Sequence, residues 1–242
     1  MKKLRYKIFL RCGLAMIAAV CVCAGAVFNN KNTKSVTASA DVTDKRTIII
    51  DAGHGGFDGG AVADDGTTEK DINLSISLTL YKFLKQNGFC VIMTRMDDTS
   101  TEDTGEAKIS SKKKSDLNNR LKLMNDYPES VFVSIHLNKF TTSAASGSQV
   151  FYSDSEKAKE LGEYIQKSIV NLIEPDNLRV NKKAGSSTFL LYNATVPAVI
   201  VECGFLSNKQ ELLLLKTKDY QDKLAFCIYC GIAEYFAANG AV

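Results

Sequence analysis

Short runs of β-branched and other apolar residues alternate with longer amphipathic segments from residue 47 onward. The short runs have the length of strands, and the longer segments repeat apolar residues at helical spacing. Strands are therefore expected at 47–51, 89–94, 131–136, 149–153, 189–192 and 199–203. Helices are expected at 69–86, 116–126, 156–172, 209–215 and 220–238. This alternation predicts an α/β fold, a three-layer α/β/α arrangement with a mostly parallel, twisted sheet of roughly six strands.

The segments 69–86 and 96–114 differ sharply in their polar pattern. Segment 69–86 has an apolar stripe at the i, i+4, i+7 spacing of a helix that faces a core. That expected stripe is Leu74, Leu78, Tyr81 and either Leu84 or Lys85. Segment 96–114 is polar and includes the run Lys112–Lys114. A run of lysines is usually solvated, so we expect a mobile surface loop there.

The first 40 residues have the pattern of an export leader. Basic residues up to Arg11 precede an apolar run from Cys12 to Phe28, a length shared by signal peptides and membrane-spanning helices. Small residues at 24–26 and 38–40 offer cleavage sites, but an uncleaved membrane anchor stays open as the alternative. We therefore expect a leader with a linker at 1–40, a folded domain at 45–240, and an exported protein.

The charge balance depends on that leader. The whole chain has a formal net charge of +3, but residues 1–40 hold seven basic residues and no acidic one. The rest has 23 basic and 27 acidic residues, a net charge of −4. A weakly acidic body gives no electrostatic reason to expect a nucleic-acid partner.

Four of the seven cysteines lie outside the leader, at positions 90, 203, 227 and 230. The pair Cys227 and Cys230 has the spacing of a redox or zinc motif, but it falls within a helical apolar pattern and no second pair accompanies it. Two small buried residues one helical turn apart are the better interpretation. We expect all four to be free thiols.

The chain has only two histidines, and each follows a predicted strand. His54 lies in a glycine-rich loop after strand 47–51, and His136 ends strand 131–136. Open α/β sheets place their sites at the carboxyl ends of strands, so the two imidazoles are expected to share one site. The loop at 53–58 has neither the final glycine of a dinucleotide-binding motif nor the Gly-Lys-Ser/Thr of a phosphate loop.

Two imidazoles and one carboxylate form a ligand set typical of catalytic zinc, which keeps its fourth position open for water. Glu69 is the preferred third ligand because it begins the helix after the His54 loop. Asp51 and Asp58 remain the alternative ligands. Taken alone, Glu69 is better explained as an acidic residue favoured at a helix N-terminus.

Glu202 lies at the end of the apolar run 198–202, where a buried carboxylate is costly unless it is paired or functional. One interpretation is a buried ion pair with Arg95 or Arg120. The other is a general base that accepts a proton from the attacking water and returns it to the leaving amine.

These motifs together resemble the zinc-dependent N-acetylmuramoyl-L-alanine amidases of the type-3 amidase family, over about residues 46–238. The matching stretches are 50–56, 69–74, 94–95, 134–138 and 201–208. The resemblance places the zinc (Zn²⁺) ligands on His54, Glu69 and His136, and the catalytic glutamate on Glu202. It also implies substrate or supporting roles for Arg120 and Asn138, although Leu137 stands where the family commonly has a small residue.

The resemblance implies a peptidoglycan hydrolase that cleaves the amide between the lactyl group of N-acetylmuramic acid and L-alanine of the stem peptide. Within the family, the chain looks like the small, single-domain, germination-specific amidases of endospore formers. That implies action in spore cortex maturation, where muramic lactam forms, and in germination, at the cell wall or in the forespore intermembrane space. The interval 139–148 is too short for the inhibitory helix that some members carry.

Two other functions stay open from the sequence. A zinc exopeptidase or deacetylase would use the same metal chemistry, and a non-catalytic wall-binding module could have the same fold. The acidic body gives no attraction to an anionic wall. We therefore expect delivery by a membrane tether through the leader, or by an exported protein that positions or activates the enzyme. The polar segment 96–114 is one surface that such a partner could use.

Overall fold

The computed structural model describes residues 47–103, 105 and 108–240, so the predicted leader at 1–40 lies outside the described residues. Within that part of the chain, no helix is both long and apolar enough to cross a membrane.

The described residues form one six-stranded sheet in the order β2-β1-β3-β6-β4-β5. Neighbouring strands are parallel except for the β4–β6 pair, which is antiparallel. The mostly parallel sheet predicted from the sequence is confirmed. The strands are β1 (Thr47–Ala52), β2 (Cys90–Met93), β3 (Ser130–Asn138), β4 (Gln149–Tyr152), β5 (Lys182–Lys183) and β6 (Ala198–Phe205).

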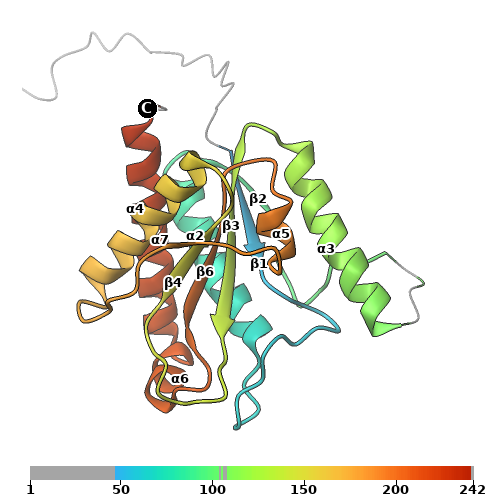
Figure 1. Ribbon diagram of the computed structural model, residues 1–242, viewed down its shortest axis with the longest axis vertical. Coiled ribbons are helices and arrows are strands. Elements are labelled where there is room, and N and C mark those ends of the chain that lie inside the picture. The colour runs from blue at the N-terminus through green and yellow to red at the C-terminus, as the bar shows by residue number, and fades with distance from the viewer. Residues whose placement is uncertain (1–46, 104, 106–107, 241–242) are drawn as a thin grey trace, which may run out of the picture. The chain divides into compact units, whose positions relative to one another are not determined.

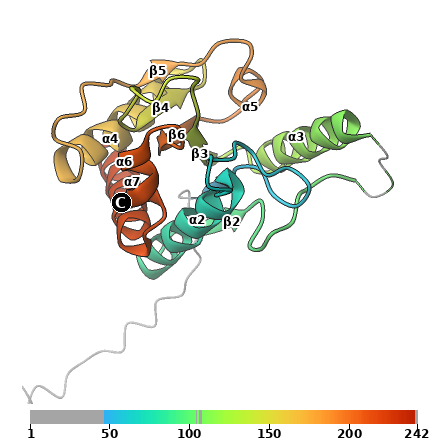
Figure 2. The ribbon, with the colours of Figure 1, turned by 90° about the horizontal axis from the view of Figure 1, so that it is seen from below.

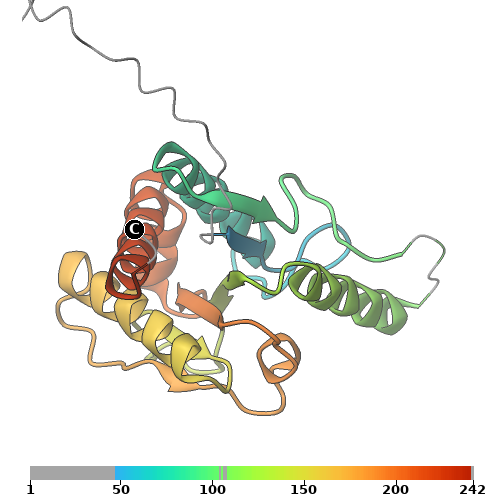
Figure 3. The same cartoon turned by 90° about the horizontal axis from the view of Figure 1, so that it is seen from above.

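Helices cover both faces of the sheet and complete the three layers (Figure 1). Figure 3, seen from above, shows α2, α4 and α7 on one side and α3 and α5 on the other. The helices are α2 (Glu69–Gln86), α3 (Ile109–Asp126), α4 (Glu156–Leu172), α5 (Phe189–Tyr192), α6 (Lys209–Leu215) and α7 (Lys218–Ala238).

Each face of the central strands has its own apolar cluster. Successive side chains of a strand point to opposite faces, so Ile48 and Ile50 join the cluster under α2, α4 and α7 while Ile49 joins the cluster under α3 and α5. All three are fully buried. A strand buried on both faces needs a continuous apolar run, and that is why the β-branched segment became the centre of the sheet.

The order of the strands reverses at β1. The chain passes from β1 through α2 to β2 on one side, and then through α3 to β3 on the other side of β1. The loop after β1 leads to α2 on one face of the sheet, and the segment after β2 leads to α3 on the other face. A crevice at such a reversal of strand order is where open α/β sheets bind ligands. Figure 2, seen from below, shows the blue loop after β1 between α2 and α3.

The segment predicted as a strand at 189–192 is instead the short helix α5. Its backbone bonds are local, since Tyr192 N–H donates to Thr188 O (2.9 Å) and Asn193 N–H donates to Phe189 O (3.1 Å). Four apolar residues are too few to show a helical or a strand period. The sixth strand is the unpredicted β5, whose two residues are exposed lysines.

Two helices also differ from the sequence prediction. α3 begins at Ile109, so Lys112–Lys114 lie within a helix and the predicted loop at 96–114 is wrong over its last six residues. α2 has the predicted bounds, but its core-facing stripe is displaced around the helix from the expected one. The fully or almost fully buried apolar residues of α2 are Ile72, Ile76, Leu80 and Leu84, whereas Leu74, Leu78 and Tyr81 are partly buried.

The four cysteines of the described residues are free, as predicted. Cys227 and Cys230 lie on α7, one helical turn apart; Cys227 is buried and Cys230 is partly buried. The interval 139–148 contains no helix, also as predicted.

Candidate functional site

The backbone places His54 in an unusual conformation directly after β1. His54 has φ of 61°, in the left-handed region, which costs an L-residue about 1–2 kcal/mol. Two contacts hold this turn: Gly53 N–H donates to Ile135 O (3.1 Å), and Arg120 donates through Nη2 to His54 O (2.8 Å). A conformation that the surroundings must maintain is typical of functional sites.

His54, Glu69 and His136 form one compact cluster at the carboxyl edge of the sheet. Nε2 of His54 lies 3.2 Å from Glu69 Oε2, and Nδ1 of His136 lies 2.9 Å from Glu69 Oε1. One donor atom from each residue lies within 4.8 Å of the other two. Three such atoms around one point form a group that could hold a metal ion, so the structure brings together the three residues predicted as ligands.

Two glycines make room for this cluster. A Cβ at Gly53 would lie 2.4 Å from the ring of His136, and one at Gly60 would lie 2.6 Å from both Glu69 Oε2 and the ring of His54. Any other residue at either position would push the donor atoms aside. Gly53 and Gly60 are therefore packing requirements of the cluster.

Glu69 is oriented by backbone donors as well as by the imidazoles. Ala61 N–H donates to its Oε2 (2.8 Å), and Leu137 N–H donates to its Oε1 (3.0 Å). Burial raises the pKa of Glu69, but its hydrogen bonds with His136 and His54 outweigh burial and hold that pKa below the ordinary range. The carboxylate is thus charged and fixed in direction, as a metal ligand must be.

The pKa of His54 reports the negative potential of the site. Burial lowers this pKa, yet the carboxylates of Asp58 and Glu69 outweigh burial and raise it to about 9. A proton and a metal cation bind the same nitrogen lone pair of the imidazole, so the negative potential that favours the proton also favours the metal cation. The donor set therefore fits a divalent cation.

The two alternative ligands lie outside the cluster. Asp58 Oδ2 is 2.9 Å from Nδ1 of His54, the nitrogen that faces away from Glu69. Asp51 is fully buried, and its carboxylate accepts hydrogen bonds from Thr94 (2.9 Å) and Ser134 (2.6 Å) and pairs with Arg120. Asp58 therefore orients a ligand, and Asp51 belongs to the scaffold beneath the loop.

Arg120 is a scaffold residue in this structure. Its Nε and Nη2 bond to Asp116 (2.8 and 3.3 Å), Nη1 bonds to Asp51 and to Ala52 O (3.1 Å), and Nη2 also bonds to His54 O (2.8 Å). These contacts use all five donors of a guanidinium, so none is left for a substrate. Of the two roles that the resemblance implied, the contacts match the supporting one.

Arg95 supports the same loop, a role that the sequence analysis did not assign. It donates to Ala52 O (2.9 Å), Gly53 O (3.1 Å) and Lys70 O (2.8 Å), and so connects the end of β1 to the first turn of α2. The only signal in the sequence was its place in one of the family-like stretches.

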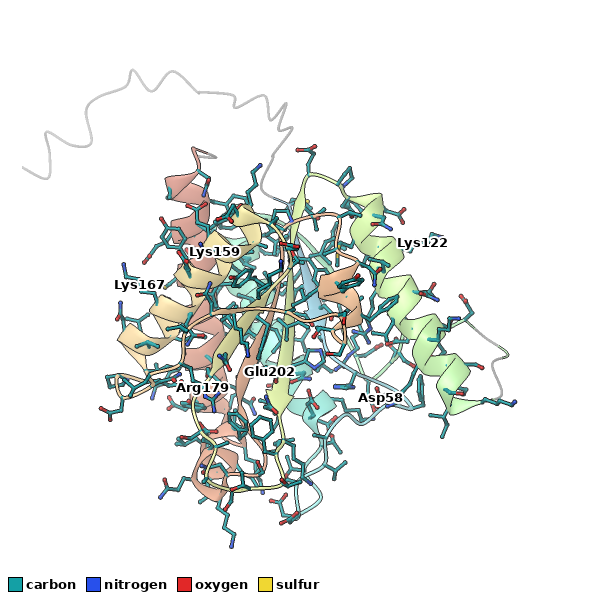
Figure 4. All side chains as sticks on the ribbon, in the orientation of Figure 1. Asp58, Lys122, Lys159, Lys167, Arg179 and Glu202 are labelled. Carbon is teal, nitrogen blue, oxygen red and sulfur yellow. The ribbon has the colours of Figure 1, made fainter. Side chains whose placement is uncertain are left out.

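Glu202 is not in an ion pair with either arginine. Its backbone on β6 is in register with His136 on β3, and residues in register on parallel strands point to the same face. Its Oε2 is buried and has no hydrogen-bond partner among the described residues. Burial raises the pKa of Glu202, and the neighbouring His136 opposes that rise only in part. Figure 4 shows Glu202 at the lower end of the sheet and Asp58 on the loop beside it.

Asn138 lies at an irregular point of the β3–β6 pairing. The β3–β6 register shifts between His136 and Asn138, and Asn138 O accepts a hydrogen bond from Leu206 N–H (2.8 Å). This irregularity lies directly after His136.

A cavity of about 150 Å³ lies beside the cluster on the α3 and α5 side. Its lining includes His54, His136, Asp58, Lys113, Leu117 and Leu190.

Comparison with known proteins gives consistent matches. The family profile described as N-acetylmuramoyl-L-alanine amidase matches residues 48–234. The germination-specific N-acetylmuramoyl-L-alanine amidase of Bacillus subtilis (strain 168) is 38% identical over 196 residues, covering 81% of this chain and 81% of that protein.

Two solved structures are also similar. The CwlD amidase from Clostridioides difficile, solved in complex with the GerS lipoprotein, has a TM-score of 0.77 and 41% identity, covering 80% of this chain and 99% of that chain. The N-acetylmuramoyl-L-alanine amidase from Clostridium difficile 630 has a TM-score of 0.70 and 30% identity, covering 82% and 100%. The family match spans the sheet, the His54–Glu69–His136 cluster and Glu202.

Proposed function

The chain belongs to the family of N-acetylmuramoyl-L-alanine amidases, and we propose that it hydrolyses its amide substrate with a zinc ion held by His54, Glu69 and His136. The bond is the amide between the lactyl group of muramic acid and L-alanine of the peptidoglycan stem peptide. The observation that carries the zinc proposal is the cluster itself, in which two imidazole nitrogens and a carboxylate converge within 4.8 Å.

The donor types and their surroundings support zinc over other cations. Nitrogen and carboxylate donors in a set of three are typical of catalytic zinc, whereas calcium and magnesium prefer sites made of oxygen alone. When bound, zinc acts as a Lewis acid and lowers the pKa of water to about 7. Asp58 would keep Nε2 of His54 directed at the ion by holding Nδ1, as carboxylates do behind zinc-binding histidines.

Glu202 is proposed as the general base and then the general acid. Its carboxylate lies on the strand next to His136 and has one oxygen without a partner among the described residues. It can therefore accept the proton of the attacking water and return it to the nitrogen of L-alanine as the amide breaks. A pKa raised by burial makes the protonated form easier to reach, which suits a group that must both take and release a proton.

The relatives suggest where this amidase acts. The Bacillus subtilis relative is named as germination-specific, and the similar Clostridioides difficile amidase was solved with a lipoprotein. We propose that this chain is exported by its leader to the cell wall or the forespore intermembrane space and acts on spore cortex. An exported lipoprotein is proposed to position or activate it, so the protein alone should turn over slowly and bind zinc less tightly than with that partner.

The test is digestion of purified spore cortex and vegetative wall, in separate reactions, by the zinc-loaded protein with and without such a lipoprotein. Mass analysis should find stem peptides with a free L-alanine amine and glycan with free lactyl groups. Shortened peptides still joined to glycan would indicate an exopeptidase, and loss of acetyl groups would indicate a deacetylase. Unchanged wall in every reaction would favour a binding module. Turnover unchanged by the lipoprotein would remove the need for a partner.

A further inference from the structure

Lys113 lies at the end of a chain of polar contacts that leads to the metal cluster. Its Nζ is 3.0 Å from Asp58 Oδ1, and the other oxygen of Asp58 is 2.9 Å from Nδ1 of His54. Lys113 comes from α3, while Asp58 and His54 lie on the loop after β1, so the contact joins two separate parts of the fold. It also places a side chain from the predicted mobile segment at the rim of the site cavity.

The position of Lys113 is electrostatically unfavourable for the helix that carries it. The first turn of α3 has no acidic residue, and Lys112–Lys114 place three positive charges near the positive end of its dipole. Asp58 is the acidic group that offsets this cost at Lys113. The adjacent Lys112 lies over the ring of Phe57, 5.6 Å from its centre. Two consecutive lysines therefore hold two consecutive residues of the loop that carries His54.

Asp58 has few other contacts that would fix it. The Asp58 backbone is fixed by its hydrogen bonds with Gly55, but apart from His54 and Lys113 its carboxylate accepts only a long hydrogen bond from Gly60 N–H (3.3 Å). Without Lys113, the Asp58 carboxylate would be held only by His54 and by that long bond, so it would turn away from the imidazole more readily. The imidazole would then lose the contact that turns its Nε2 toward Glu69.

We propose that Lys113 is a positioning residue for the metal site, acting through Asp58 to hold the His54 imidazole in its ligating orientation. This inference rests on the proposed function, since it requires that the cluster bind zinc. Lys113 touches neither the cluster nor the carboxylate of Glu202 in the contacts that the structure gives. Its effect should therefore appear first in metal affinity.

The experiment measures the zinc affinity of the metal-free protein by competition with a coloured chelator. Lys113→Met should weaken zinc binding by about threefold to tenfold. Replacing a direct partner of a metal ligand typically costs roughly 10- to 100-fold, and the effect should be smaller here because Lys113 is one contact further from the metal and its side chain is half exposed. Lys113→Arg should restore most of the affinity. Lys114→Met is the matched control: it removes the same charge one residue further on, from an exposed side chain with no ion pair among the described residues, and should leave the affinity unchanged.

A double-mutant cycle separates action through Asp58 from a general charge effect. Asp58→Asn should weaken zinc binding by roughly 10-fold or more, and adding Lys113→Met to it should change little further. The thermal midpoint of the metal-free protein should be the same for Lys113→Met and Lys114→Met. The positioning role would be overturned if Lys113→Met and Lys114→Met lost equal amounts of zinc affinity, or if the affinity losses of Lys113→Met and Asp58→Asn were additive in the cycle. If the unaltered protein fails to bind zinc, the proposed function fails as well, whereas tight zinc binding unchanged by Lys113→Met refutes this inference alone.

Discussion

Replacing Arg120 by methionine should destabilise the fold more than any single change on the exposed faces of the helices. The Arg120 side chain is 2% exposed, and the Asp51 side chain that it pairs with is 1% exposed. Removing one partner of a buried ion pair typically costs about 3–5 kcal/mol, because the other charge stays buried without compensation. Asp51 would keep its hydrogen bonds from Thr94 and Ser134, so we expect a loss near the lower end, about 3 kcal/mol.

The assay is urea unfolding followed by far-ultraviolet circular dichroism, since the chain has no tryptophan for fluorescence. Lys122→Met is the matched control on the same helix, because Lys122 is exposed, and it should change stability by less than about 0.5 kcal/mol. Adding Asp51→Asn to Arg120→Met should recover part of the loss, since the unpaired charge is then removed. A loss under about 1 kcal/mol for Arg120→Met, with an unchanged denaturant slope, would refute the reasoning.

Two further predictions concern the same edge of the sheet. Burial raises the pKa of Asp51, but Arg120, together with His136 and the hydrogen bonds from Ser134 and Thr94, outweighs burial and lowers that pKa below its ordinary value of 3.8. The ionised carboxylate therefore stabilises the fold above about pH 4, and this contribution is lost as pH falls further. Below about pH 4, the unfolding free energy should consequently fall more steeply with decreasing pH in the unaltered protein than in Asp51→Asn. Equal slopes in the two proteins would contradict the stabilising role of the Asp51 carboxylate. Gly60→Ala should weaken zinc binding by at least about 10-fold, because its Cβ would meet Glu69 and His54, while Gly59→Ala, whose Cβ meets nothing within 4 Å, should bind zinc normally. Similar chelator-competition curves for the two alanine variants would show that the close approach is unimportant.

The location of the site could be predicted from the sequence because it depends on strand ends. His54 and His136 each follow an apolar run, and the carboxyl ends of parallel strands meet at one edge. The position of Glu202 follows in the same way from its place at the end of a third run. Continuous apolar runs and a parallel sheet were thus enough to bring these residues to the same edge.

The contacts around the site could not be predicted in this way. Arg120 and Asp51 are 69 positions apart, and no local pattern indicates that they pair. The choice between Asp58 and Glu69 as ligand depends on which nitrogen of His54 each carboxylate faces, a matter of side-chain orientation. α3 was predicted only from residue 116 because its first seven residues, 109–115, are mostly serine and lysine. Ser115 is the only one of the seven that is buried, so this part of the helix shows no apolar period.

Zinc content and turnover measured together in Glu202→Gln test most directly whether the metal ligands and the base are separate residues. The variant should hold one zinc per chain, as in the unaltered protein, because Glu202 lies outside the His54–Glu69–His136 cluster. Its turnover on cortex should be lower by about 100-fold or more, the usual contribution of a general acid–base group. Full zinc content with near-normal turnover would contradict the assignment of Glu202 as the base. Loss of zinc together with turnover would contradict the three-residue cluster as the complete ligand set.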